Sequence, residues 1–557
     1  MSLEIHIPPK GMYHHEILHR HHGSPSRPTL EWNDTHLEEL KSLGFNAMQL
    51  NIAWGWRPND EALNLQDILV LPDRDEETNR KCQMRQDALR HRLALCKKHG
   101  LRTIFHFGAP FNGSDPYDGK PPSNCISDPS VTELYINLLE QMSIQLPGVD
   151  DILIYTYDQD AWLCSEFTGC PACRGVPLHK RLPAFLNSLC RKWASINPDG
   201  ILWWEPWELS SGQSLRIIQE LPDKNFGFCA HSNIGEVQKS RPADLWLRNL
   251  AMVASRRGIP VVAELFMSEA SEETEPLRRV PCPRLTFDQI RTVLSVPGIA
   301  GIKEYYGLHP ESNDPCLAMV GQALLHPQDD VQTCLARIAA PYGEYAGEMI
   351  QMWESVADGY MLYPWDASWF AREIGNAGID HGWCAAFVRG QQCSTPSWDS
   401  TRHAIFMKTD NNQPHAWMLE DLQLRCEMAA EAFRAALDMG HSLLPRVPET
   451  YRAQMEETLA SVEHFMRVCV SYMLHMRETN VAMLLREDQF RKRPLQADLL
   501  AEMEQLLMAD AENQRHTGRV MTILEAWQKD PGAWLNLYLL PGAGERREGG
   551  YFSLTTR

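Results

Sequence analysis

The chain reads PGIAGIKEYY at residues 297–306, a helix-ending signal followed by a short apolar run and a polar end. Glycine readily adopts the left-handed conformation that closes a helix, and aliphatic residues bounded by such a signal favour a strand. We therefore predict a strand from Ile299 to Tyr306 that carries Lys303, Glu304 and Tyr305 where it ends.

Seven further runs of the same kind precede this one, each separated from the next by a polar loop and a segment of helical period. Alternation of strands and helices is typical of a parallel sheet, and eight repeats is the number in a closed (β/α)8 barrel. The sequence thus predicts an α/β fold in which residues 1–330 form a TIM barrel. The eight runs are Glu4–Tyr13, Phe45–Trp54, Leu101–Gly108, Asp151–Asp158, Gly200–Trp207, Asn225–Ser232, Ile259–Phe266 and Ile299–Tyr306.

Glycines at the helix-to-strand junctions support these assignments. We expect left-handed cap conformations at Gly44, Gly100, Gly200, Gly258 and Gly298. A doubly wound open sheet is the structural alternative, but the glycine-rich phosphate turn that usually follows its first strand is absent from the sequence.

After the predicted barrel, apolar residues recur at three- and four-residue spacing, which is typical of helices. We predict a C-terminal α-helical domain over residues 331–540, with a loop-rich insert near 363–413 and an irregular tail at 541–557. The longest predicted helical segments are His415–His441, Glu449–Leu485 and Leu495–Lys529.

The composition excludes some classes of partner. The 557 residues carry a net charge of −19, which repels phosphate backbones and anionic lipid headgroups, so we expect neither a nucleic acid nor a membrane as partner. The N-terminal segment lacks the apolar stretch of a signal peptide, which predicts a cytoplasmic protein. Exposed faces of the helical domain would allow a homo-oligomer.

A cysteine cluster follows the fourth predicted strand. Cys170 and Cys173 form a Cys-Pro-Ala-Cys turn, Cys164 lies six residues earlier, and Cys125 belongs to the loop after the third strand. Four thiolates would form a closed structural zinc site that joins two neighbouring loops, with His179 as a substitute ligand. The alternatives are buried reduced thiols or a redox pair. No organic cofactor is expected.

Polar and aromatic residues collect at the predicted C-terminal ends of the strands, the face on which barrel enzymes build their active sites. Tryptophan rings stack on the flat faces of sugars, and imidazole or charged groups bind sugar hydroxyls, so we predict a carbohydrate substrate. The predicted substrate-binding residues are His14, His15, Trp54, His106, Asp158, Trp204, Glu205, His231, Lys303, Glu304 and Tyr305.

The acidic motif Asp158-Gln159-Asp160 at the fourth strand, with the cysteines behind it, resembles the zinc-containing retaining β-galactosidases among the (β/α)8 glycoside hydrolases. That family has Asp-Asn-Glu in this place. The resemblance implies that Asp160 is the acid/base and that Glu264, at the end of the seventh strand, is the nucleophile. Aspartate in place of glutamate, and Gln159 in place of asparagine, are departures from the family pattern.

The barrel followed by helices also resembles α-glucuronidases and hexosaminidase-like barrels. In some of these an acidic pair at the fourth strand assists attack by the substrate's own acetamido group, a role that Asp158 and Asp160 could take.

Together these features predict a glycosidase that is retaining and exo-acting and that cleaves short oligosaccharides or glycosides. Retaining hydrolysis requires two carboxyl groups about 5–5.5 Å apart, and the fourth and seventh strands can supply them across the barrel mouth. One alternative is a non-catalytic carbohydrate-binding barrel. Another is a metal-dependent hydrolase, for which the histidines near the strand ends would be ligands.

Overall fold

The computed structural model describes most of the chain, in ranges separated by gaps. The described residues are 11–14, 32–51, 64–108, 124–156, 166–167, 169–206, 209, 211–230, 239, 242–269, 274, 277, 279–304, 313–365, 415–514, 522–538, 545–546 and 552–553.

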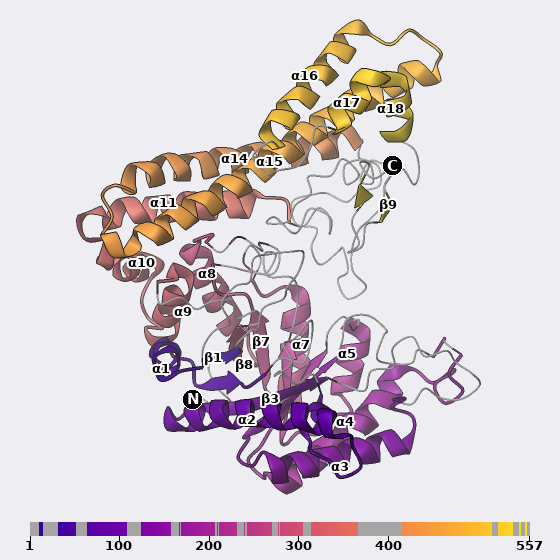
Figure 1. Ribbon diagram of the computed structural model, residues 1–557, viewed down its shortest axis with the longest axis vertical. Coiled ribbons are helices and arrows are strands. Elements are labelled where there is room, and N and C mark those ends of the chain that lie inside the picture. Colours follow the sequence, from indigo (N-terminus) through magenta and orange to yellow (C-terminus); the bar gives the residue numbers. More distant parts are fainter. Residues whose placement is uncertain are drawn as a thin grey trace. The chain divides into compact units, whose positions relative to one another are not determined.

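Eight parallel strands form a closed barrel in sequential order, and β1 pairs with both β2 and β8 (Figure 1). The (β/α)8 prediction is therefore confirmed. The strands are β1 (Gly11–His14), β2 (Ala47–Gln49), β3 (Arg102–Gly108), β4 (Asp151–Thr156), β5 (Leu202–Pro206), β6 (Phe226–Ala230), β7 (Val261–Leu265) and β8 (Ile299–Glu304).

A helix follows each strand. Many of these helices begin at an Asn or Asp whose side chain accepts a hydrogen bond from the first-turn backbone, as Asp75 does from Thr78 and Asp244 from Leu247. The helices are α1 (Asp34–Ser42), α2 (Glu76–Lys98), α3 (Pro129–Gln145), α4 (Leu178–Ile196), α5 (Ser211–Ile218), α7 (Leu245–Arg256), α8 (Pro283–Leu294) and α9 (Pro315–Leu325), and the 3-10 helix η1 (Leu65–Ile68) precedes α2.

Four of the five predicted cap glycines adopt positive φ angles, from 68° at Gly100 to 94° at Gly298. The prediction for Gly200 was wrong, because its φ is not in the left-handed region. A Cβ atom at Gly200 would overlap the backbone oxygen of Asp150 and the indole of Trp193, so the chain needs glycine there for space.

An ion pair and a tryptophan ring fill the barrel interior at the N-terminal ends of the strands. Arg102 binds the buried Asp151 through two hydrogen bonds of 2.7 and 2.6 Å, and the Trp203 indole donates to the same carboxylate at 3.2 Å. Gly227 on the neighbouring strand leaves space for the Trp203 ring. This layer closes the barrel opposite the face that carries the polar strand ends.

The chain divides into two compact units. The described residues of the barrel unit lie before Glu269 and in Thr286–Asp329. Those of the second unit lie in Glu269–Leu285 and from Asp330 onward, so a segment between β7 and β8 belongs to the helical unit. Within that unit the buried guanidinium of Arg279 binds the buried Glu269 carboxylate at 2.6 Å.

The second unit consists mainly of helices, and α15 packs against both α14 and α16 (Figure 1). The expected segment 495–529 contains two helices, with 515–521 outside the described residues, and the predicted irregular tail contains two short paired strands. The elements are α10 (Val331–Ala339), η4 (Ala340–Tyr345), α11 (Ala346–Leu362), α14 (His415–Leu443), α15 (Glu449–Phe490), α16 (Ala497–Gln514), α17 (Thr522–Lys529), α18 (Pro531–Tyr538), β9 (Glu545–Arg546) and β10 (Phe552–Ser553).

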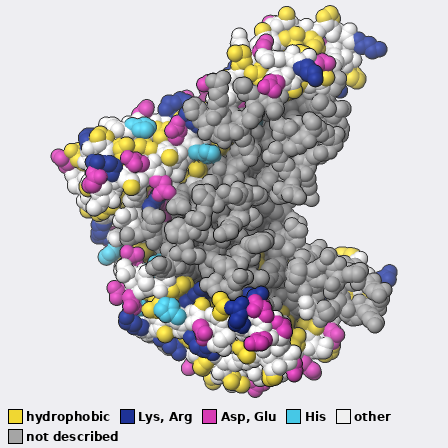
Figure 2. All heavy atoms as spheres, viewed as in Figure 1, with side chains coloured by type: hydrophobic (Ala, Val, Ile, Leu, Met, Phe, Trp, Pro, Cys, Tyr) yellow, Lys and Arg dark blue, Asp and Glu magenta, His cyan; other side chains and the backbone are white. Residues whose placement is uncertain are grey.

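On the face shown in Figure 2, acidic and basic side chains are interspersed over the described surface of both units. Among the described residues, no helix combines the length and the hydropathy needed to cross a lipid bilayer.

Candidate active site

Two glutamates and one lysine meet inside the barrel. The Lys303 ammonium donates to Glu205 Oε2 at 2.8 Å and to Glu264 Oε1 at 2.6 Å. All three side chains are buried, with at most 2% of their surface exposed. The cluster joins three strands that are far apart in the sequence, and one ammonium group bridges two carboxylates.

The strands place this cluster at the functional end of the barrel. Glu205, Glu264 and Lys303 are each the second-to-last residue of their strand. Side chains alternate between the two faces of a strand, and β5 and β8 are not neighbours, so these residues can meet only in the interior. In a (β/α)8 barrel the C-terminal ends of the strands surround the usual position of the active site.

Burial and charge shift the pKa values of the cluster. Burial raises the pKa of Glu264 well above its usual range, and the nearby carboxylate of Glu205 raises it further, whereas Lys303 opposes both effects. Burial favours a lower pKa for Lys303, but the charges of Glu205 and Glu264 outweigh it and raise the pKa above its usual value. The lysine thus stays cationic, and Glu264 holds a proton more tightly than an exposed glutamate.

A second polar group lines the interior on β2, β3 and β4. The Gln49 amide donates to the backbone oxygen of Asn51 at 3.0 Å and contacts His106 Nδ1 at 2.7 Å. This contact fixes the orientation of the His106 ring relative to the Gln49 amide. The His106 ring also packs edge-on against Tyr155, with 5.6 Å between ring centroids. Gln49, His106 and Tyr155 therefore form one polar and aromatic group on three neighbouring strands.

Sequence reasoning did not select Gln49 and Tyr155. Both lie within predicted strands, and both alternate with apolar residues that face the helices. That period-two pattern was the available signal, since it places Tyr155 on the same face as Leu153 and Asp151.

Two predicted substrate-binding residues face away from the interior. Trp204 precedes Glu205 on β5, so it points to the opposite side of the strand, where its ring packs edge-on against Phe228 at 5.2 Å. Glu304 follows Lys303 on β8, and its carboxylate accepts a hydrogen bond from the backbone of Met267 at 2.7 Å. Strand alternation directs both side chains outward, away from the interior that holds Glu205 and Lys303.

Most of the remaining predicted site residues are not among those that the structure describes. His14 lies at the end of β1, where only the backbone is described. The predictions outside the described residues concern His15, Trp54, Asp158, Asp160, Cys164, His231 and Tyr305.

Three of the four predicted zinc ligands come together. The Cys125 sulfur lies 3.3 Å from that of Cys173 and 3.8 Å from that of Cys170, and all three thiols are buried. These separations exceed a disulfide bond and approach the roughly 3.8 Å expected between sulfurs of a tetrahedral zinc site. Arg181 donates to the Cys173 sulfur at 3.0 Å. Burial raises the pKa of the Cys173 thiol to about 11, so metal binding there must displace a proton.

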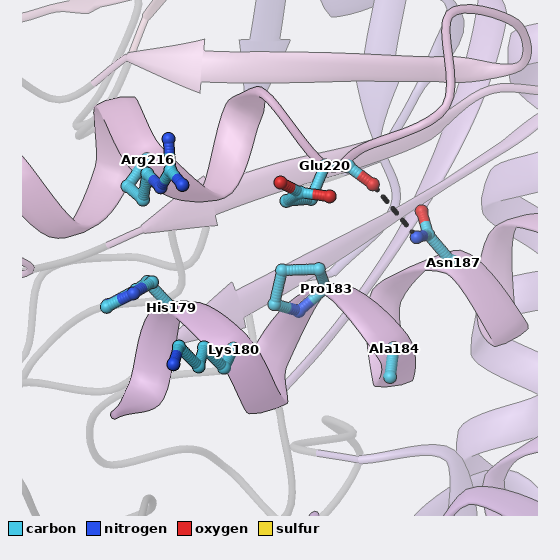
Figure 3. A pocket seen from close by; sticks show the side chains of 7 residues that line it. All are labelled: His179, Lys180, Pro183, Ala184, Asn187, Arg216 and Glu220. Atoms are coloured by element: carbon cyan, nitrogen blue, oxygen red, sulfur yellow. Dashed lines mark hydrogen bonds between the residues drawn. The ribbon is translucent and has the colours of Figure 1, made fainter. Parts of the chain in front are cut away.

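The predicted substitute ligand, His179, lies elsewhere. It lines an open groove of about 390 Å³ between α4 and α5, together with Lys180, Arg216 and Glu220 (Figure 3). The Asn187 amide donates to the backbone oxygen of Glu220 at one end of this groove. Among the described residues, the group that could hold a metal at this position contains the three cysteines without a histidine.

Comparison with known proteins identifies the fold. No protein-family model and no curated protein matches the sequence. A GH138 enzyme targeting pectin rhamnogalacturonan II superposes with a TM-score of 0.56 and 10% identity, covering 93% of this chain and 77% of that one. The O-GlcNAc hydrolase of Thermobaculum terrenum superposes with a TM-score of 0.44 and 13% identity, covering 95% of this chain and 93% of the hydrolase. The chain thus has the (β/α)8 fold of a solved glycoside hydrolase, extended by a helical region.

Proposed function

We propose that this protein is a glycoside hydrolase whose reaction takes place at the C-terminal ends of the barrel strands. The observation that carries this proposal is the pair of buried glutamates, Glu205 and Glu264, joined by Lys303 inside that end. Glycosidic cleavage requires carboxyl groups held in a fixed geometry beside the sugar. The fold shared with the GH138 enzyme supports the same class.

In the proposed retaining mechanism, Glu264 attacks the anomeric carbon and Asp160 protonates the leaving oxygen. Asp160 then deprotonates the water that hydrolyses the glycosyl-enzyme ester. Lys303 fixes the orientation of the Glu264 carboxylate and supplies the positive charge that allows it to ionise in a buried position. Glu205 binds the same lysine, and its negative charge raises the pKa of the Glu264 carboxyl.

The substrate that we propose is a short oligosaccharide or glycoside, cleaved from its end in the cytoplasm. The His106 imidazole would hydrogen-bond to a sugar hydroxyl. The other proposed contacts come from strand ends and from the loops that follow them, namely His14, His15, Trp54, Asp158, His231 and Tyr305.

A structural zinc ion is the proposed metal component. Cys125, Cys170 and Cys173 would hold it together with Cys164, and a closed set of four thiolates leaves no position for a substrate or a catalytic water. Such an ion would join the loops after β3 and β4 without taking part in hydrolysis.

A panel of nitrophenyl glycosides tests the proposal, and it should include galactosides, glucuronides and N-acetylhexosaminides. We expect turnover of at least one substrate, and a loss of roughly 10²- to 10⁴-fold in kcat for Asp160→Asn and Glu264→Gln. Glu220→Gln is the control, because Glu220 lines the groove between α4 and α5. Binding of sugars without turnover on the panel would instead indicate a carbohydrate-binding barrel. Full activity of Glu264→Gln would remove that residue from the reaction.

A further inference from the structure

Helices α15 and α16 of the helical unit pack against each other along a contact that we call the seam. The side chains in the seam are apolar at one end and polar at the other. At one end, Ala482 and Leu485 of α15 share an apolar cluster with Met503 and Leu507 of α16. At the other end the contact is polar, and the Asn513 amide donates to the Ser471 hydroxyl at 2.7 Å. A buried polar side chain destabilises a helix contact unless it is hydrogen-bonded, paired with a charge or bound to a metal ion.

Between these two ends lie three side chains of the types that bind metal ions. His475 Nε2 lies 2.9 Å from Asp510 Oδ2, and Glu478 follows His475 by one helical turn on α15. One ligand atom from each residue lies within 4.8 Å of the other two. His475 and Glu478 are fully buried, and Asp510 is 3% exposed.

We propose that His475, Glu478 and Asp510 bind a divalent transition-metal ion, for which Zn²⁺ is the appropriate probe. One imidazole nitrogen and two carboxylate oxygens form a donor set that zinc accepts, and a water molecule can complete a tetrahedral shell. The residues His475 and Glu478 at i and i+3 project from one helix face, as metal ligands in helical bundles do.

This site differs from the cysteine cluster in both place and chemistry. It lies in the helical unit, its donors are nitrogen and oxygen, and its ligands come from two helices that are separate in the sequence. The ion would tie α15 to α16 at the point where their apolar contact gives way to polar residues. Metal binding would therefore stabilise the helical unit, independently of any reaction in the barrel.

The experiment uses the full-length protein carrying Cys125→Ser and Cys173→Ser, so that binding to the thiols does not obscure the result. After chelation and dialysis, Zn²⁺ is titrated by calorimetry and the Tm is measured with and without the ion. We expect one Zn²⁺ per chain and a higher Tm with the metal. Co²⁺ should bind without the charge-transfer absorption that thiolate ligands produce.

Three variants in the same background assign the site. His475→Gln and Glu478→Gln should each weaken Zn²⁺ binding at least tenfold and remove the increase in Tm. Ser471→Ala is the matched control, because it removes a partly buried hydrogen bond between α15 and α16 but no proposed ligand. Absence of Zn²⁺ binding in the background with Cys125→Ser and Cys173→Ser would overturn the proposal, and so would unchanged binding in Glu478→Gln, the more conservative of the two ligand variants. These outcomes do not depend on glycosidase activity.

Discussion

Two buried carboxylates share a single lysine at the end of the barrel. With both glutamates ionised, the group formed by Glu205, Glu264 and Lys303 would carry a net negative charge away from water, which is costly. Burial and the charge of Glu205 both favour the protonated form of Glu264, and they therefore raise its pKa. A nucleophile held in this way reacts only above the pH at which it loses its proton.

Glu205→Gln should therefore move the acidic limb of the kcat/KM profile to lower pH. The substitution removes the like charge that raises the pKa of Glu264 and keeps the hydrogen bond from Lys303 to Glu264. The same raised pKa of Glu264 also makes the free energy of unfolding depend on pH. A carboxyl whose folded-state pKa is raised stabilises the fold fully below its unfolded pKa, and this contribution is lost as the pH rises through the folded pKa. The variant should lose less stability over that interval, as urea unfolding at several pH values would measure.

Lys303→Met is the opposing variant. It should shift the same limb to higher pH and lower the free energy of unfolding by roughly 3–5 kcal/mol, because it leaves buried carboxylates without their cation. Identical pH profiles for wild type and Glu205→Gln would contradict the proposed coupling between these three residues.

At the scale of elements, a large side chain on β5 packs against a glycine on the neighbouring strand β6. Trp203 on β5 fills the closed end of the barrel, and Gly227 on β6 is its partner in register. The φ of Gly227 is not in the left-handed region, so the constraint at this position is steric. A Cβ atom at Gly227 would overlap the six-membered ring of Trp203.

Gly227→Ala should accordingly destabilise the barrel by roughly 1–3 kcal/mol, since the Trp203 ring must move within a closely packed interior. Urea unfolding followed by circular dichroism would measure the change. Gly212→Ala on α5 is the control, because a Cβ there meets no atom within 4 Å and alanine favours helix. Equal stabilities of the two variants would contradict the steric explanation.

The loops after β3 and β4 meet at the three buried cysteines. Cys173→Ser should reduce the zinc content by one ion per chain and lower the Tm by roughly 2–4 °C for each kcal/mol of binding free energy lost. Metal analysis and thermal unfolding would check both effects, and Cys190→Ser, a buried thiol elsewhere on α4, is the control. Equal zinc contents in the two variants would show that the cluster holds no zinc.

At the scale of the whole molecule, the sequence predicted the barrel well because its signals are local. Seven of the eight predicted runs contain an observed strand, β1 extends one residue past the first run to His14, and helix-ending glycines such as Gly258 mark the junctions. The same periodicity predicted α14 and α15, whose observed bounds extend only a few residues beyond the predicted ones.

Features that depend on contacts distant in the sequence were not predicted. Lys303 was recognised as a polar strand end, but its bridge between Glu205 and Glu264 depends on closure of the barrel. Nor does periodicity indicate that the segment Glu269–Leu285 belongs to the helical unit, where Arg279 forms an ion pair of 3.6 Å with Glu457 of α15. The outward position of Trp204 follows from the alternation of faces along β5, which composition at the strand end does not include.

Covalent labelling of the nucleophile tests the central claim most directly. The wild-type protein would be incubated with the 2-deoxy-2-fluoro glycosyl fluoride of the sugar preferred on the nitrophenyl panel, then digested and analysed by mass spectrometry. A retaining mechanism predicts one slowly hydrolysed glycosyl ester per chain, attached to Glu264. An ester on another carboxylate, or no ester in a preparation that turns over the parent glycoside, would contradict the assignment of Glu264.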